Sequence, residues 1–167
     1  MEPFARLGAA LNEAGVRFVT IGANLWARSG HTMFTTLDYD LFLPPDPENA
    51  LRAWQAADAA GLDLFCGDDP LDRPRDRFLA ERIVERRSLV RATDGAGFDA
   101  DFALVMAGFA FEEIFTRRRT FEVEGVPIGV ALLRDIVASK AAAGREKDRL
   151  FLAAHAEALK SLIEEGD

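Results

Sequence analysis

The sequence predicts a mixed α+β domain built on a single sheet, and three observations indicate this fold class. Apolar, β-branched stretches alternate with segments of helical spacing through the first part of the chain. Helical segments alone follow residue 131. No linker or low-complexity tract divides the 167 residues, a length typical of one domain. We therefore expect one domain with a mixed sheet flanked by helices, comprising a core of about residues 15–131 and a C-terminal helical part of about residues 132–164.

The N-terminal region is predicted to begin with a helix and two strands. Apolar residues at helical spacing predict a helix over Pro3–Ala14, and Gly15 is a typical stop. The β-branched, apolar run Val16–Ile21 predicts a buried strand. Gly22 then opens a short segment of helical character, and Thr36–Leu43 is the second predicted strand.

The next segment is predicted to contain a helix, a short strand and a loop. Asp46 is a typical N-cap and Pro47 a typical first helical residue, so we expect a helix that runs to about Ala60. Leu62–Cys66 has the character of a short strand. Acids, prolines and arginines over Gly67–Arg75 predict a loop.

The elements of the rest of the chain are predicted from the same signals: hydrophobic period, β-branched content and glycine turns. In chain order we expect a helix over Asp76–Val84, strands over Ser88–Ala92 and Phe98–Val105, a hairpin of Thr120–Val123 with Pro127–Ala131, and helices over Leu132–Ala143 and about Arg145–Ile163.

The composition limits the kinds of function. A net charge of −8 argues against a surface dominated by nucleic-acid-binding charge. Arginines cluster at 73–91 and 117–119, where a basic patch could meet a polyanion, although ordinary salt-bridged surface is the alternative. The single Cys66 excludes an internal disulfide and a cysteine-based metal site. The longest apolar run, Phe102–Phe111, is too short to span a bilayer, and no secretory signal is evident. We expect a cytoplasmic protein with no membrane partner.

Two carboxylates lie one residue apart in the second predicted strand. Side chains alternate between the faces of a strand, so Asp38 and Asp40 point the same way and Tyr39 the other. Two carboxylates this close repel each other, and each is costly to bury without a cation. A divalent ion with oxygen ligands such as Mg²⁺ relieves both costs. The alternative is the solvated face of an amphipathic strand.

Two further features favour the metal interpretation. Asp99 and Asp101 share one face of another predicted strand, and either could supply the third carboxylate of a two-metal site for phosphoryl transfer. Gly22 lies at a strand-to-helix junction before the Asp pair. A glycine there lets the backbone approach a phosphate, and the following helix start offers unpaired N–H groups.

The glycine turn, the Asp pair and the later acid follow one another in an order that resembles the pattern of the nucleotidyltransferase fold superfamily. Its pattern is an apolar strand, a Gly-Gly or Gly-Ser that opens a helix, an Asp-x-Asp on the next strand and a third acid on a later strand. The corresponding residues here are Ile21-Gly22-Ala23, Asp38-Tyr39-Asp40, and Asp101 with Asp99 as its rival.

Within the superfamily the chain looks most like the small AbiEii-type nucleotidyltransferases, over about Gly15 to Leu159. These carry a late helical signature similar to Asp135–Asp148, with its Ser139-Lys140 and Arg145-x-Lys147-Asp148. Ala23 departs from the family pattern, which prefers Gly or Ser. Phe34 stands where the family often has Arg, and Thr36 keeps the family's Thr.

The resemblance implies a catalytic site. Asp38, Asp40 and Asp101 would be the catalytic carboxylates and would hold Mg²⁺ or Mn²⁺, with Asp101 acting as or assisting the base. A nucleoside triphosphate would bind through Gly22, Ala23, Thr36 and Lys140. Attack on the α-phosphorus would transfer a nucleoside monophosphate and release pyrophosphate.

The acceptor stays open at this point. The resemblance suggests the 3′ end of a tRNA, in a toxin–antitoxin setting with an antitoxin protein as partner. A protein or small-molecule hydroxyl, such as that of a cationic aminoglycoside, is the alternative, because the net charge is acidic. A different class of function also fits, namely a catalytically inactive nucleotide- or protein-binding domain of the same fold, to which Ala23 and Phe34 point.

Overall fold

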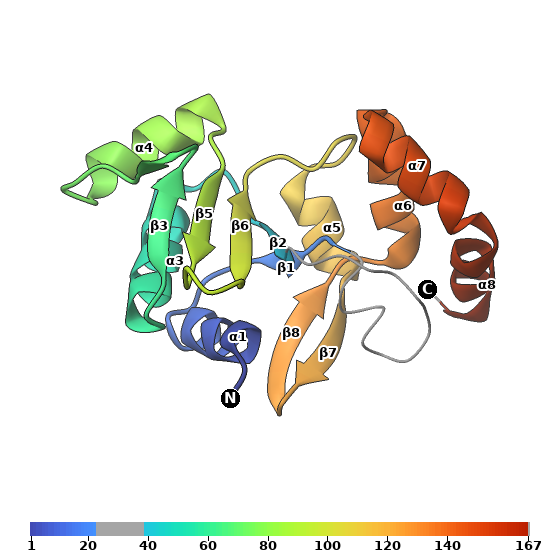
Figure 1. The fold of residues 1–167 in the computed structure, drawn as a ribbon, viewed down its shortest axis with the longest axis horizontal. Helices are drawn as coiled ribbons and strands as arrows, with labels where there is room; N and C mark the ends of the chain where they lie inside the picture. Colours follow the sequence, from blue (N-terminus) through green and yellow to red (C-terminus); the bar gives the residue numbers. More distant parts are fainter. Residues whose placement is uncertain (23–38, 167) are drawn as a thin grey trace.

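One eight-stranded sheet runs through the described part of the chain, residues 1–22 and 39–166 of the computed structural model (Figure 1). Its strand order is β4-β3-β5-β6-β2-β1-β8-β7. The pairs β2–β6 and β1–β8 are parallel, and the other pairs are antiparallel. Helices flank this sheet and close the chain, so the predicted mixed α+β fold class is confirmed. The strands are β1 (Val19–Thr20), β2 (Tyr39–Phe42), β3 (Asp63–Cys66), β4 (Asp69–Pro70), β5 (Val90–Thr93), β6 (Asp99–Ala103), β7 (Arg119–Val123) and β8 (Val126–Val130).

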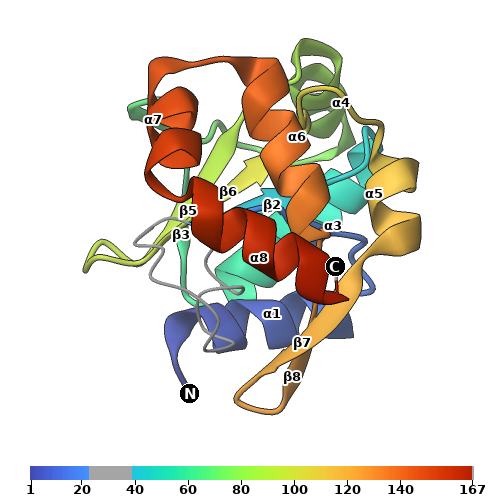
Figure 2. The same ribbon diagram turned by 90° about the vertical axis from the view of Figure 1, so that its right-hand side faces the viewer.

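The helices divide into two groups around the sheet. Figures 1 and 2 show α1 and α3 along one face of the sheet, and α6, α7 and α8 together at the far side of the molecule from α4. The described helices are α1 (Pro3–Glu13), α3 (Pro47–Ala59), α4 (Arg77–Arg86), α5 (Phe111–Arg117), α6 (Leu133–Ala143), α7 (Glu146–Ala154) and α8 (Ala156–Gly166). None of the helices in these described ranges is long and apolar enough to cross a membrane.

The main core lies between the sheet and the pair α1 and α3. Leu41 of β2 and Phe102 of β6 are almost fully buried, as is Trp54 of α3. Tyr39 stacks on Phe4 of α1 with ring centroids 4.1 Å apart, as expected for a side chain on the strand face opposite the acids. Burial of each large apolar side chain stabilises the fold by about 1.5–3 kcal/mol, so this layer holds the central strands in place.

Helix boundaries agree closely with the capping signals. Asp46 accepts a hydrogen bond from the backbone N–H of Glu48 and caps α3. Asp76 caps α4 in the same way, accepting from the N–H of Leu79. Gly144, at φ +63°, ends α6 in the left-handed conformation that glycine adopts readily.

Four local predictions were wrong or incomplete. No element was predicted over Phe111–Arg117, which is α5, a short helix whose Glu113 accepts a hydrogen bond from the N–H of Ala110. The segment predicted as a loop contains the two-residue strand β4. The single C-terminal helix is divided at His155 into α7 and α8, because the bend lets both halves contact α6. The first strand is also shorter than the predicted Val16–Ile21.

Helix α1 lies very close to β8 at Gly8. A Cβ placed on Gly8 would come 2.3 Å from Cδ1 of Ile128, a side chain that is fully buried. The hydrogen atom of Gly8 is therefore what lets α1 pack onto this strand.

We predict that Gly8→Ala destabilises the protein by about 1–2 kcal/mol, because overpacking exceeds the gain from the better helix former. Urea unfolding followed by circular dichroism measures this change. Ile128→Val removes Cδ1, so Gly8→Ala added to Ile128→Val is expected to cost nothing further. An equal loss of stability from Gly8→Ala in both backgrounds would contradict the packing argument.

Candidate active site

Two predicted site residues occupy paired positions on neighbouring central strands. In the parallel pair β2–β6, Asp40 is the register partner of Asp101. Leu41 and Phe102, one residue further on, point into the core with α1 and α3. Since side chains alternate, both acids point away from that core. Asp101 is only 7% exposed, and Asp40 is half-buried.

Register separates the two candidates for the third acid. Asp101 pairs with Asp40 on one side and with Arg91 on the other. Asp99 pairs with Thr93 of β5 and lies one strand repeat away from that position. The geometry therefore favours Asp101 over Asp99 as the carboxylate that acts together with Asp40.

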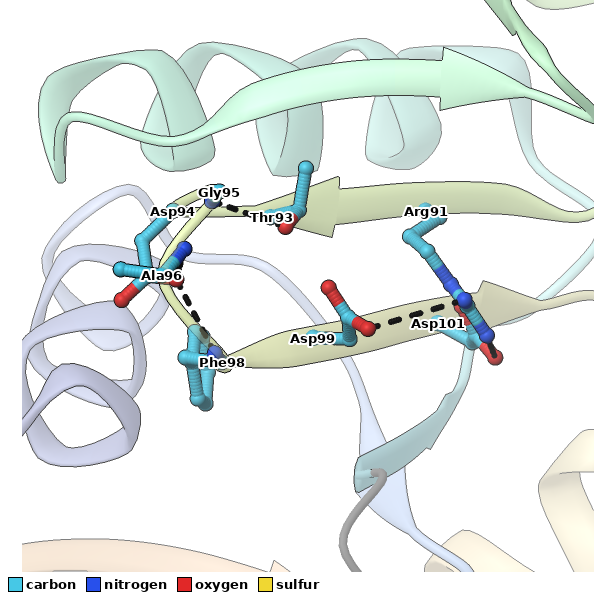
Figure 3. Close-up of polar contacts among 8 residues, drawn as sticks. All are labelled: Arg91, Thr93, Asp94, Gly95, Ala96, Phe98, Asp99 and Asp101. Atoms are coloured by element: carbon cyan, nitrogen blue, oxygen red, sulfur yellow. Dashed lines mark hydrogen bonds and ion pairs between the residues drawn. The ribbon is translucent and has the colours of Figure 1, made fainter.

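Arg91 of β5 holds Asp101 through both oxygens (Figure 3). Its Nε donates to Oδ1 at 2.7 Å and its Nη2 to Oδ2 at 3.0 Å. A third nitrogen, Nη1, lies 3.6 Å from Oδ2 of Asp99. This two-point contact neutralises a buried carboxylate that would otherwise be costly. Arg91 was not predicted as a site residue; its place on the predicted strand that precedes the strand of Asp101 was the available signal.

The turn between β5 and β6 fixes this arrangement. Asp94 accepts from the backbone N–H groups of Ala96 and Phe98, at 2.8 and 3.0 Å, and Thr93 accepts from the N–H of Gly95 at 3.0 Å (Figure 3). The two bonds from Ala96 and Phe98 lower the pKa of Asp94. The turn is thus ordered by its own side chains and sets the register in which Arg91 meets Asp101.

A cavity of about 380 Å³ joins the sheet to the C-terminal helices. Asp40 lines it on the sheet side, and Ser139, Lys140 and Arg145 line it on the helical side. The other lining residues within the described ranges are apolar: Ile21, Val105, Met106, Ala107, Ile136 and Ala143. One cavity therefore carries a carboxylate on one wall and two cations on the other. This cavity thus brings Asp40 together with Ser139, Lys140 and Arg145, which belong to the late signature that resembles the AbiEii-type family.

Asp148 anchors the cationic wall. Asp148 is only 1% exposed. Its Oδ2 accepts a hydrogen bond from Nε of Arg145 at 2.7 Å, and its Oδ1 lies 3.7 Å from Nζ of Lys140. Burial opposes ionisation of Asp148, but the hydrogen bond from Arg145 and the nearby charges of Arg145, Lys140 and Lys147 together hold its pKa below the ordinary value. Lys140 also lies over the ring of Phe151, 4.6 Å from its centroid. Both cations of the cavity are therefore positioned by α7.

A second buried acid positions α6 itself. Asp135, in the first turn of α6, is 6% exposed and accepts from Nε and Nη2 of Arg117 at 2.7 and 3.1 Å. The contact raises the pKa of Arg117. It ties the end of α5 to the start of α6, the helix that carries Ser139 and Lys140. Arg117 belongs to the run 117–119, for which the sequence indicated only a basic patch or a salt-bridged surface.

Several predicted site residues lie outside the described residues. These are Ala23, Thr36 and Asp38. Gly22 directly follows Ile21, whose N–H donates to the backbone oxygen of Asp40 at 2.9 Å and which lines the cavity. The glycine is thus next to the cavity in the chain.

The chemistry of the available ligands fits a hard divalent cation. Asp40 and Asp101 carry carboxylate oxygens, the ligands that Mg²⁺ and Mn²⁺ prefer, at paired positions on adjacent strands, and both oxygens of Asp101 already accept hydrogen bonds from Arg91. Within residues 1–22 and 39–166 no group of three or more His, Cys, Asp or Glu side chains could hold a metal ion. The predicted set of three requires Asp38.

Comparison with known proteins adds no relative. No protein-family model matches the chain, and no curated protein matches it. The resemblance to nucleotidyltransferases therefore stays a prediction.

We predict that Asp148→Asn destabilises the protein by about 1.5–3 kcal/mol at neutral pH, the range for hydrogen bonds to charged groups. The folded-state pKa of Asp148 is lowered, so its contribution is complete above about pH 4 and is lost as the pH falls through that lowered value. Urea unfolding at a series of pH values from 7 to 3 should show the difference between Asp148→Asn and the native chain shrinking below pH 4.

Glu146→Gln, an exposed acid on the same helix, is the control and should change stability little at any pH. A deficit in Asp148→Asn that stayed constant down to pH 3 would rule out the ion pair as its cause.

Proposed function

We propose that this protein is a metal-dependent nucleotidyltransferase that moves a nucleoside monophosphate from a nucleoside triphosphate to an acceptor hydroxyl. The observation that carries the proposal is the shared cavity, in which Asp40 faces a wall that holds Lys140 and Arg145. A triphosphate with a bound divalent cation needs this combination, since its oxygens contact fixed cations while the metal contacts a carboxylate.

The cationic wall would bind the phosphates. Lys140 is a mobile point charge on the last turns of α6, and Arg145 presents a planar fork at the start of α7. Asp148 pairs with both cations and holds them at the helical side of the cavity. Gly22, next to the cavity residue Ile21, has no side chain to obstruct a phosphate that approaches the backbone.

The carboxylates would hold the metal. Asp38, Asp40 and Asp101 are the predicted ligands, and a divalent cation bound there would supply charge neutralisation and alignment for the transfer. Asp40 would orient the α-phosphate from the sheet side of the cavity. Asp101 already accepts two hydrogen bonds from Arg91, which favours a supporting role over that of the proton acceptor.

The reaction balances simply. The acceptor oxygen forms a bond to the α-phosphorus, the bond from that phosphorus to the bridging oxygen breaks, and pyrophosphate leaves. The hydroxyl proton passes to a carboxylate or to water. We propose the 3′ end of a tRNA as acceptor in a cytoplasmic toxin–antitoxin setting, with an antitoxin protein as partner, and a protein or small-molecule hydroxyl as the alternative.

One observation favours a second candidate function. Arg91 occupies both oxygens of Asp101, as expected if this carboxylate were structural. A domain that binds a nucleotide or a protein partner without catalysis would tolerate this pairing. Turnover separates the two functions, because both would bind nucleotide.

We predict that Asp40→Asn lowers the rate of nucleotidyl transfer about 100-fold or more, since it removes charge from the reacting site. The protein is incubated with Mg²⁺, each α-labelled nucleoside triphosphate and either total bacterial RNA, a protein extract or aminoglycosides. Asp63→Asn, an exposed acid on β3, is the matched control and should keep full activity. Nucleotide binding with no labelled product on any acceptor would favour the non-catalytic domain.

We also predict that Lys140→Met weakens nucleoside triphosphate binding roughly tenfold or more, the equivalent of one lost charge-assisted hydrogen bond. Isothermal titration calorimetry with a non-transferable triphosphate analogue measures the change. Lys147→Met removes the same charge from an exposed position that does not line the cavity, and should bind almost normally. Equal losses in the two variants would show that only general charge matters.

A further inference from the structure

We infer that Arg91 takes the place of a second divalent cation at Asp101, so that the candidate site binds one metal ion, through Asp40, rather than two. This inference rests on the proposed function, and it names Arg91 as a positioning residue. The sequence pattern alone had suggested a two-metal site with Asp101 as the third ligand.

The first argument is the geometry of the contact. Arg91 reaches Asp101 across adjacent, directly paired strands, with two donors matched to two oxygens at 2.7 and 3.0 Å. Figure 3 shows the Arg91 side chain reaching from β5 to β6, where its guanidinium meets Asp101 and Asp99. A fork matched to both oxygens is the strongest form of arginine–carboxylate contact.

The second argument is burial. Asp101 is 7% exposed, whereas the Arg91 side chain is 41% exposed. A buried carboxylate requires a counter-charge, and here Arg91 supplies it from the neighbouring strand β5. The Arg91 guanidinium thus binds the buried Asp101 carboxylate, while part of the Arg91 side chain stays accessible to solvent.

The third argument concerns charge. A dication at Asp101 would lie against the guanidinium of Arg91, which is positively charged at every accessible pH. Asp99, 3.6 Å from the same guanidinium, further stabilises Arg91 in place. Asp101 is also absent from the residues that line the cavity with Asp40 and Lys140. The cavity therefore presents Asp40, and not Asp101, to an entering ion.

Counting bound Mn²⁺ tests the inference. The native protein is titrated with Mn²⁺ alone, and free Mn²⁺ is followed by electron paramagnetic resonance. We expect one ion per chain, retained in Asp101→Asn and lost in Asp40→Asn. Arg91→Met should take up a second ion, which adding Asp101→Asn to Arg91→Met should remove. Arg77→Met, an exposed arginine on α4 that pairs with Glu48 and Glu81, is the control and should bind one ion.

Each other outcome is decisive. Two ions on the native protein, with one lost in Asp101→Asn, would overturn the inference and leave the proposed function intact. No ion on the native protein would overturn the inference, whereas the proposed function would still be decided by the transfer of label from the nucleoside triphosphate. A folded Arg91→Met that still bound one ion would show that Arg91 does not exclude the second. If Arg91→Met does not fold, the counts for the native protein and for Asp101→Asn decide the question.

Discussion

The pairing of β2 with β6 is the constraint on which the rest of the molecule depends. Its register sets Leu41 beside Phe102 on the core face and Asp40 beside Asp101 on the other. Because the side-chain period of a strand is two, a slip of one residue would turn Asp40 toward α1 and Leu41 toward the cavity. The stacking of Tyr39 on Phe4 and the burial of Leu41 hold the register that gives the acids their place.

Three buried acids stabilise the architecture around that pair, and each is bound by an arginine. Asp101 with Arg91 joins β6 to β5, Asp135 with Arg117 joins α6 to α5, and Asp148 with Arg145 fixes the start of α7. In each contact the carboxylate is the buried partner and the arginine is partly exposed. The long apolar stem of arginine suits this use, since it packs against the protein while its charged end stays near water. Pairs of a buried aspartate and a partly exposed arginine thus position both the sheet side and the helical side of one cavity.

Local signals in the sequence were sufficient for most of the fold. Caps such as Asp46 and Asp76, the stop at Gly144 and the alternation in β2 all act within a few residues, so their outcome can be read from a single segment. The short helix α5 was not predicted because it begins at the end of the apolar run Phe102–Phe111, in which no polar residue marks where a new helical period starts. The break at His155 depends on contacts with α6, which no property of residues 145–163 reports.

The candidate site was predicted in part for the same reason. The alternation of side chains predicted that each strand presents its acids on one face, but it could not distinguish Asp101 from Asp99. Only the strand register shows that Asp101, and not Asp99, is paired with Asp40. The roles of Arg91 and Arg117 arise from partners that lie on other strands and helices, so the sequence showed them only as members of arginine-rich stretches. Asp38, Ala23 and Thr36 fall outside the described residues.

The division of the cavity between sheet and helices has a consequence for how the protein is made. Asp40 emerges early during synthesis, and the sheet can assemble once β8 has been translated. The cationic wall needs Asp148 on α7 to hold Lys140 and Arg145 in place, so it forms only near the end of the described chain. A nascent chain would therefore carry the sheet with its acids before it carried the cationic wall, so the two sides of the cavity would come together only late in synthesis.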